Sequence, residues 1–326
     1  MSSSTRLVAA PGRTWREVLS SSWRQNIIYL GFVAIFAFFA VTLYSKGFLD
    51  PNNLLNILRQ TAMIAIMAVA MTFVLSAGEI DLSIGAVAGL ASVTTAMGLD
   101  AGGWPLGITC GILTGLVVGC CNGLLTTRIG IPSFLTTLAM MGVARGVAMW
   151  VSDTSAIPIM GRSYPFWFGG GNLGPVPTLL VWMLVAAVIG HLVLRRTPFG
   201  RRILATGGNE TAARYSGVDT RSIKLRALGI SSFAAGLAGM LYAGRLHSGR
   251  FQLGEGDELS VIAAAVLGGT SLFGAAGTVV GSIFGALMIG LINNGLILMG
   301  LEFSQQLTAR GAIIIIIAVA ISQPRK

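Results

Sequence analysis

The sequence predicts an all-α integral membrane protein with about ten transmembrane helices, some of them short or broken. Of its 326 residues, 54% are hydrophobic and only 10% are charged, and the mean hydropathy is +0.78. A soluble domain carries about 25% charged residues, and a disordered chain would combine low hydrophobicity with high charge. Apolar runs long enough for a bilayer core, which needs about 20 helical residues, recur along the whole chain. Both soluble and disordered classes are therefore excluded.

Ten apolar segments follow one another, and glycine- or proline-containing stretches separate many of them. The predicted spans are Ile27–Tyr44, Thr61–Ala77, Leu82–Leu99, Leu106–Thr126, Ser133–Val151, Thr178–Leu194, Leu225–Ala243, Val261–Leu272, Val279–Met299 and Leu307–Ile321. The eighth is short and ends beside glycines, which favours a broken or re-entrant helix. Glycines at every fourth residue, at 111, 115 and 119, and a second series at 281, 285 and 290 predict closely packed helices.

The charge distribution predicts the domain organisation and the orientation. Residues 1–26 form a polar segment in which Trp15–Gln25 suits an interfacial helix, residues 27–322 form one transmembrane domain, and residues 323–326 are a basic tail. The loop 195–226 carries eight Lys and Arg residues. Because cytoplasmic loops of membrane proteins are enriched in Lys and Arg, we expect this loop and both termini in the cytoplasm. Six spans precede the loop and four follow it. Because both numbers are even, the loop and the two termini lie on the same side of the membrane.

The basic cytoplasmic segments account for the net charge of +10. We therefore expect the chain to contact membrane lipid and not nucleic acid. The loop Ser152–Pro177 should then face outward, either as a simple connector or as a docking or gating surface.

The chain lacks the residue patterns of an enzyme. No HExxH, GxSxG or Walker-type GxxxxGK[ST] motif occurs, and His191 and His247 lie in different predicted regions. The three cysteines lie within one apolar stretch, which suits small apolar residues better than a disulfide or a metal site. We therefore expect no catalytic residue, no metal and no bound cofactor. Active transport would need an ion gradient or a separate ATPase that binds ATP and Mg²⁺.

Two carboxylates, Glu79 and Asp81, lie between two apolar spans in the sequence SAGEIDLSIG. Three interpretations stay open at this stage. The pair is a proton or sodium relay of a gradient-driven carrier, or a solvated turn in which Asp81 caps the next helix, or a structural element of a transport pathway. Arg145 is the strong cation inside a predicted span.

The basic loop contains a short predicted helix between glycines. Asn209 is a good N-cap for it, Glu210 favours its first turn, and Gly217 suits a left-handed end, after which Asp219 or Thr220 caps the next element. This helix is either an ordinary connector or a knob that transmits the movement of a soluble partner.

Four stretches resemble the ribose/arabinose/xylose-type permeases of ABC transporters. They are GRRILATGGNETAARYSGV (200–218), AGEIDLSIGAVAGLASVTTA (77–96), IPSFLTTLAMMGVARGVA (131–148) and LSVIAAAVLGGTSLFGAAGTVVGSIFGA (259–286). Their order and spacing fit over nearly the whole chain after the first ~25 residues. Glu79 departs from the small residue that is frequent in that family, and Ala275–Ala276 departs from its glycine.

The resemblance implies a large-cleft importer permease that moves a monosaccharide by alternating access. It implies three partners: a second permease copy or paralogue, an ATPase with fused nucleotide-binding domains, and a periplasmic sugar-binding protein. It also implies that the short helix contacts the ATPase. The residues expected to couple to the ATPase are Asn209, Glu210, Thr211, Ala212, Ala213, Arg214, Ser216 and Gly217.

Polar residues within or beside the spans are candidates for the solute pathway or its gate, because sugar hydroxyls need partners in an apolar setting. They are Glu79, Asp81, Ser83, Asn122, Thr136, Thr137, Asn293 and Asn294, with Gln305 and Gln306 as further polar residues. Helix–helix hydrogen bonding is the alternative role for Asn293 and Asn294. A gradient-driven carrier, a permease for a non-sugar solute, and a structural or receptor-like membrane protein stay open as competing functions.

Overall fold

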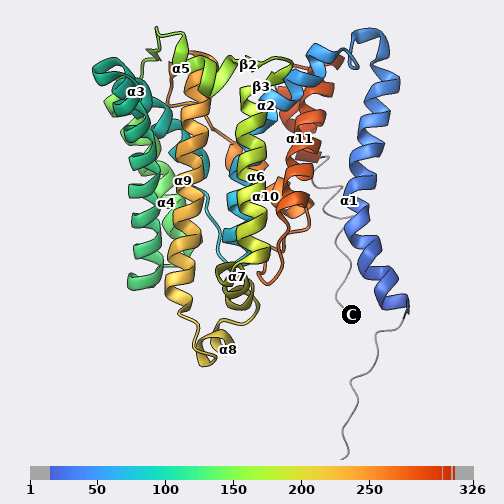
Figure 1. Cartoon of the computed structure of the whole chain (residues 1–326), viewed down its shortest axis with the longest axis vertical. Helices are drawn as coiled ribbons and strands as arrows, with labels where there is room; N and C mark the ends of the chain where they lie inside the picture. The colour runs from blue at the N-terminus through green and yellow to red at the C-terminus, as the bar shows by residue number, and fades with distance from the viewer. Residues whose placement is uncertain (1–14, 303, 310, 313–326) are drawn as a thin grey trace, which may run out of the picture.

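The computed structural model describes residues 15–302, 304–309 and 311–312. Long helices stand side by side, and two shorter helices, α7 and α8, project at one end of the bundle (Figure 1). The helices are α1 (Trp15–Thr42), α2 (Pro51–Ser76), α3 (Ile84–Leu124), α4 (Ser133–Val151), α5 (Ser163–Pro165), α6 (Thr178–Arg196), α7 (Pro198–Gly208), α8 (Glu210–Tyr215), α9 (Thr220–Leu246), α10 (Asp257–Leu267) and α11 (Val279–Met299). The start of α1 lies at the same end as α8.

Short elements join these helices. A 3-10 turn follows α1 (η1, Tyr44–Lys46), and π-helical turns follow α3 and α5 (η2, Leu125–Ile129; η3, Phe166–Gly170). Four two-residue strands form two antiparallel pairs: β1 (Ile157–Pro158) with β4 (Ser248–Gly249), and β2 (Asn172–Leu173) with β3 (Val176–Pro177). The all-α prediction is therefore confirmed.

Nine of the ten predicted spans coincide with a helix or with half of one. The predictions Ser133–Val151 and Val279–Met299 match α4 and α11 at both ends. The third and fourth spans are the two halves of α3, which bends at Gly102 and Gly103. Within the described residues, six helices are long and apolar enough to cross a membrane. The tenth predicted span, Leu307–Ile321, lies largely outside the described residues, so the total of ten stays a prediction.

Several boundaries differ from the prediction, and the starts of α2 and α1 differ most. Helix α2 begins at Pro51, ten residues before the predicted Thr61, because Asp50 caps it by accepting from the Asn52 N–H and Pro51 occupies the first turn. Helix α1 continues upstream to Trp15 without a break, so the segment predicted to be interfacial is an extension of the first helix.

The core is built around α2, whose residues from Thr61 to Ala77 are all buried. The α3–α9 contact uses the predicted glycine series. A Cβ at Gly115 would overlap the carbonyl oxygen of Ser232, and one at Gly119 would lie 3.0 Å from the Cα of Gly229. The series on α11 packs in the same way, since a Cβ at Gly285 would overlap the Ala264 carbonyl oxygen of α10. Both glycine predictions are confirmed.

The eighth predicted span overlaps the short helix α10, which ends at Leu267 and not at the predicted Leu272. With 11 residues α10 is too short to cross a membrane, as the length of the span indicated. After α9 and β4, residues 250–256 are non-helical and run beside the first half of α3 before α10 begins. Ser92 of α3 donates to the Arg250 carbonyl at 3.0 Å. A Cβ at Gly89 would come within 2.7 Å of the carbonyl oxygens of Phe251 and Leu253. Such backbone is tolerated at membrane depth where protein or a water-filled cavity surrounds it. We call residues 250–256 the unwound segment.

Candidate coupling site and solute pathway

The α7–α8–α9 connection folds through a series of side-chain caps. Thr197 caps α7 by accepting from the Gly200 N–H at 3.2 Å, and Asn209 caps α8 by accepting from the Ala212 N–H at 2.9 Å. Gly217 has a φ of +82° after the end of α8, and Asp219 accepts from the Ser222 N–H at 3.1 Å to begin α9. The predicted caps and the glycine end are therefore confirmed. The sequence predicts that the glycines before the short helix, Gly207 and Gly208, interrupt the chain, but they form the end of α7.

Helix α8 turns one side to the protein and leaves the rest open. Ala213 is buried and Glu210 is half-buried, while the other predicted coupling residues are exposed: Asn209, Thr211, Ala212, Arg214, Ser216 and Gly217. The last residue of α8, Tyr215, is 89% exposed. The sequence prediction omitted Tyr215, although an aromatic residue in a short polar helix is itself a signal of a contact surface.

A three-membered charge network ties α8 to the turn between α2 and α3. The Lys224 Nζ, in the first turns of α9, lies 2.6 Å from Glu79 Oε1 and 2.7 Å from Glu210 Oε2. The Glu79 side chain is only 8% exposed. Glu210 also accepts from Arg214 at 2.7 Å and from Thr220 at 3.1 Å. The hydrogen bond from Lys224 is the main reason that the pKa of Glu210 is lowered. We call Glu79, Lys224 and Glu210 the coupling network.

Backbone contacts lie beside this network. The Ala275 N–H donates to the Ser76 carbonyl at 3.3 Å. A Cβ at Gly207 would overlap that same carbonyl oxygen and would lie 2.9 Å from the Ala275 nitrogen. The ends of α2 and α7 and the loop after α10 therefore meet at one point. Ala275 has a φ of +68°, a left-handed conformation that glycine adopts without strain.

Asp81 lies in a different environment from its neighbour Glu79. It is fully buried, and its Oδ1 accepts from the Ser83 N–H at 2.9 Å and from the Ser83 hydroxyl at 2.6 Å. The interpretation of a solvated turn is therefore wrong, because the protein encloses it. The Asp81 carboxylate does accept a backbone N–H at the start of α3, that of Ser83, which directly precedes the helix. Burial raises the pKa of Asp81 and favours its neutral form.

The remaining pathway candidates lie mostly between helices. Asn122 donates to the Ser83 hydroxyl at 2.9 Å, and the Thr137 hydroxyl accepts from the Leu82 N–H at 3.0 Å. Asn294 exchanges hydrogen bonds with Asn53 of α2 at 2.8 and 3.1 Å. Thr136 is buried and Asn293 is half-buried. The contacts of Asn122, Thr137 and Asn294 suit helix–helix hydrogen bonding.

Arg145, near the middle of α4, contacts the unwound segment. Its Nη1 donates to the Phe251 carbonyl at 3.0 Å and forms an ion pair with Glu255 Oε2 at 3.2 Å. The Arg145 side chain is 22% exposed and that of Glu255 is 69% exposed. Glu255 was not singled out from the sequence, because nothing local to it indicates that it meets a residue 110 positions earlier.

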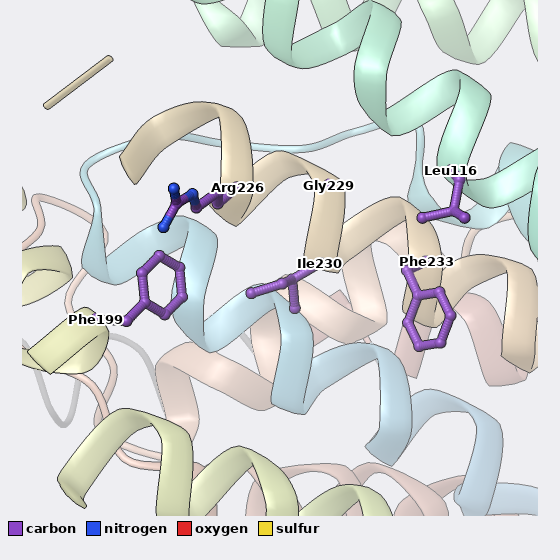
Figure 2. A pocket seen from close by; sticks show the side chains of 6 residues that line it. All are labelled: Leu116, Phe199, Arg226, Gly229, Ile230 and Phe233. Carbon is purple, nitrogen blue, oxygen red and sulfur yellow. The ribbon is translucent and has the colours of Figure 1, made fainter. Parts of the chain in front are cut away.

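A shallow groove of about 440 Å³ lies on the surface between α3, α7 and α9. Leu116 and Phe233 line one end of it, and Phe199 and Arg226 line the other (Figure 2). Its walls are apolar apart from Arg226. A sugar needs several hydrogen-bonding groups, so we do not place the solute in this groove.

Six helices of the described residues are long and apolar enough to cross a membrane, which defines the class of polytopic membrane proteins. Residues 53–320 match a protein family described as "Branched-chain amino acid transport system / permease component", and the chain belongs to this family. The protein is therefore a transport subunit of the membrane.

Individual relatives cover between 73% and 97% of the chain. The ribose import permease protein RbsC of Bacillus subtilis is 41% identical over 287 residues, which are 87% of this chain and 89% of the relative. The L-arabinose ABC transporter permease protein AraH of Azospirillum brasilense is 34% identical over 318 residues, 97% of this chain and 92% of the relative. The autoinducer 2 import system permease protein LsrC of Photorhabdus laumondii is 37% identical over 246 residues, 73% and 72% of the two chains. No solved structure matches the chain. The resemblance to ABC sugar permeases is confirmed.

Proposed function

We propose that this chain is the permease subunit of an ATP-driven importer that moves a monosaccharide or a related polyhydroxylated solute into the cytoplasm. The observation that carries the proposal is the similarity, over nearly the full length, to permeases named for ribose and L-arabinose. Its partners would be a second permease copy or paralogue, an ATPase with fused domains that holds ATP and Mg²⁺, and a periplasmic binding protein. The inner membrane is the proposed location, with the α8 end and both termini in the cytoplasm.

We propose that α8 is the contact for the ATPase. An exposed tyrosine surrounded by small and polar residues suits a protein interface, in which tyrosine is enriched among the residues that contribute most to binding. A movement of α8 would pass through Glu210 and Lys224 to Glu79 and so to the turn that begins α3. It would also pass through the backbone contact of Gly207 with Ser76 to the end of α2. The first route thus ends at the start of α3, and the second ends at α2, the helix around which the core is built.

A gradient-driven carrier is the second candidate, with Glu79 and Asp81 in its ion site. The ion pair of Glu79 with Lys224 argues against it, since a relay residue needs a carboxylate that is free to exchange its proton. A non-sugar solute within the same family is an alternative that the relative named for autoinducer 2 keeps open.

The test is uptake by vesicles that contain the purified chain alone, or the chain with the ATPase and binding protein encoded beside its gene. D-ribose and L-arabinose are the probes. We expect ATP-dependent accumulation only with the partners. Accumulation by the chain alone under an ion gradient would instead establish the carrier.

A variant then tests the α8 contact. We expect Tyr215→Ala to lower uptake and transport-coupled ATP hydrolysis at least tenfold, because truncating an anchoring tyrosine costs about 2 kcal/mol of binding or more. Tyr44→Ala is the matched control. Tyr44 is 73% exposed and follows the last residue of α1, at the end of that helix that lies away from α8. Equal uptake by the two variants would remove α8 as the ATPase contact.

A further inference from the structure

The ion pair between Arg145 and Glu255 lies at membrane depth. Helix α4 has 19 residues and so is about 28 Å long. Arg145 follows Ser133 by 12 residues and precedes Val151 by six, which places it about 18 Å from one end of the helix and about 9 Å from the other. The unwound segment lies within reach of the Arg145 side chain, because the Phe251 carbonyl accepts from Arg145.

The exposure of this pair is unusual for its depth. The Glu255 side chain is 69% exposed in the single chain, and Gln252 of the same segment is also exposed. Charged residues within membrane spans almost always face the interior of a bundle or a water-filled cavity, because contact with hydrocarbon is costly. The part of the surface that carries Arg145, Gln252 and Glu255 is therefore unsuited to lipid, although other exposed residues of α4, such as Val143 and Trp150, are apolar. By contrast, the exposed face of α6 carries Leu184, Val188 and Leu192, as a lipid-facing surface does.

The chemistry of the exposed groups fits a hydroxylated solute. Arg145 is a donor, Glu255 is an acceptor and the Gln252 amide is both. Most carbonyl groups of the unwound segment already accept hydrogen bonds within the chain, so its side chains are the groups that could meet a solute. Irregular segments beside half-helices form the binding sites of many transporters. The segment contains glycines that permit its shape, since Gly254 and Gly256 have φ values of +79° and +77°.

We propose that Arg145, Gln252 and Glu255 line the solute pathway and contact the hydroxyl groups of the transported solute, in a water-filled space that this face forms with a second permease subunit. The solute class rests on the function proposed above, but the presence of water at Glu255 does not. The pathway is thus assigned to the surface of the unwound segment, and the buried polar residues Asn122, Thr137 and Asn294 hold the helices together.

The first experiment measures access of water to this face. Glu255→Cys and the control Val188→Cys are made in a variant in which Cys110, Cys120 and Cys121 are replaced by serine, and are expressed in membranes with the partner subunits. A charged, membrane-impermeant thiol reagent is the probe. We expect Glu255→Cys to react at least tenfold faster than Val188→Cys, because Val188 is 57% exposed in the structure but faces lipid. If Glu255→Cys reacted at the same rate as Val188→Cys or more slowly, lipid or protein would cover position 255, and the proposal would be overturned.

The second experiment tests contact with the solute. Arg145→Gln and Glu255→Gln are measured for uptake of D-ribose and L-arabinose by the complete transporter. We expect KM to rise at least tenfold, and we expect the charge-exchanged double variant Arg145→Glu with Glu255→Arg to recover part of the loss. Unchanged KM in both single variants would overturn the solute contact. Failure of the unmodified transporter to take up either sugar would instead refute the proposed substrate class, and the thiol reactivity would still decide whether the face is wet.

Discussion

Two charged regions of this chain differ in how fully they are closed. In the coupling network, Lys224 contacts two carboxylates at 2.6 and 2.7 Å, and one of them, Glu79, is almost fully buried. In the pair on α4 and the unwound segment, Arg145 contacts Glu255 at 3.2 Å, and most of that glutamate is exposed. A buried pair satisfies its charges within the chain and thereby joins two elements, whereas an open pair keeps hydrogen-bonding capacity for another molecule. The buried pair therefore suits a mechanical link between two elements, and the exposed pair suits a surface that binds another molecule.

The largest expected effect is the difference in stability between two variants, each of which lacks the cation of one pair. Lys224→Met leaves Glu79 buried without its cation, which typically costs about 3–5 kcal/mol of stability. Arg145→Met leaves a mostly exposed carboxylate, and we expect a cost below about 1 kcal/mol. The apparent melting temperature of the purified protein in detergent ranks the two variants.

The double variant Glu79→Gln with Lys224→Met is the control for this ranking. It removes both buried charges, so it should be more stable than Lys224→Met alone. Equal losses in Lys224→Met and Arg145→Met would contradict the distinction between a closed and an open pair.

A smaller effect is expected from the backbone contact beside the coupling network. Gly207→Ala places a methyl group against the Ser76 carbonyl oxygen, and the neighbouring backbones have little room to move. We expect a cost of about 1–3 kcal/mol, which is typical of overpacking, together with reduced uptake. Gly208→Ala is the matched control, because its Cβ would meet only the Ala275 side chain at 3.4 Å, an ordinary contact. Identical melting temperatures for the two variants would show that this contact is not tight.

The sequence predicted those features that depend on local composition. The boundaries of α4 and α11, the separation of the two halves of α3 and the caps of α8 and α9 all follow from residues within a few positions of each feature. The start of α2 was missed because the segment from Pro51 to Arg59 is too polar for a hydropathy argument, although Asp50 and Pro51 form a recognisable helix start.

The sites themselves depend on contacts that local composition does not contain. Glu79 and Lys224 lie in distant parts of the chain, as do Arg145 and Glu255, so no spacing rule pairs them. The same holds for Asp81, since a good capping sequence gives no information on whether the finished bundle covers the turn. The predicted α8 residues are present as a helix, but their contact with an ATPase is a proposal, as is the location in the inner membrane.

The smallest expected effect is the pH dependence of the coupling network. The pKa of Glu210 is lowered from its ordinary value of 4.5, mainly by the hydrogen bond from Lys224. A carboxyl group with a lowered pKa in the folded state contributes stability above its ordinary pKa, and this contribution is lost as the pH falls through the lower folded value. The apparent melting temperature of wild type should therefore fall relative to that of Glu210→Gln as the pH is taken from about 6 to below about 4.5.

This pH effect is small because the Glu210 side chain is 35% exposed and solvent screens its charge. A Lys224→Met background supplies the control, since the main cause of the lowered pKa is absent there. In that background, the pH-dependent difference in melting temperature between the chain that keeps Glu210 and the chain that also carries Glu210→Gln should shrink. A difference that is independent of pH in the presence of Lys224 would contradict the charged hydrogen bond between α8 and α9.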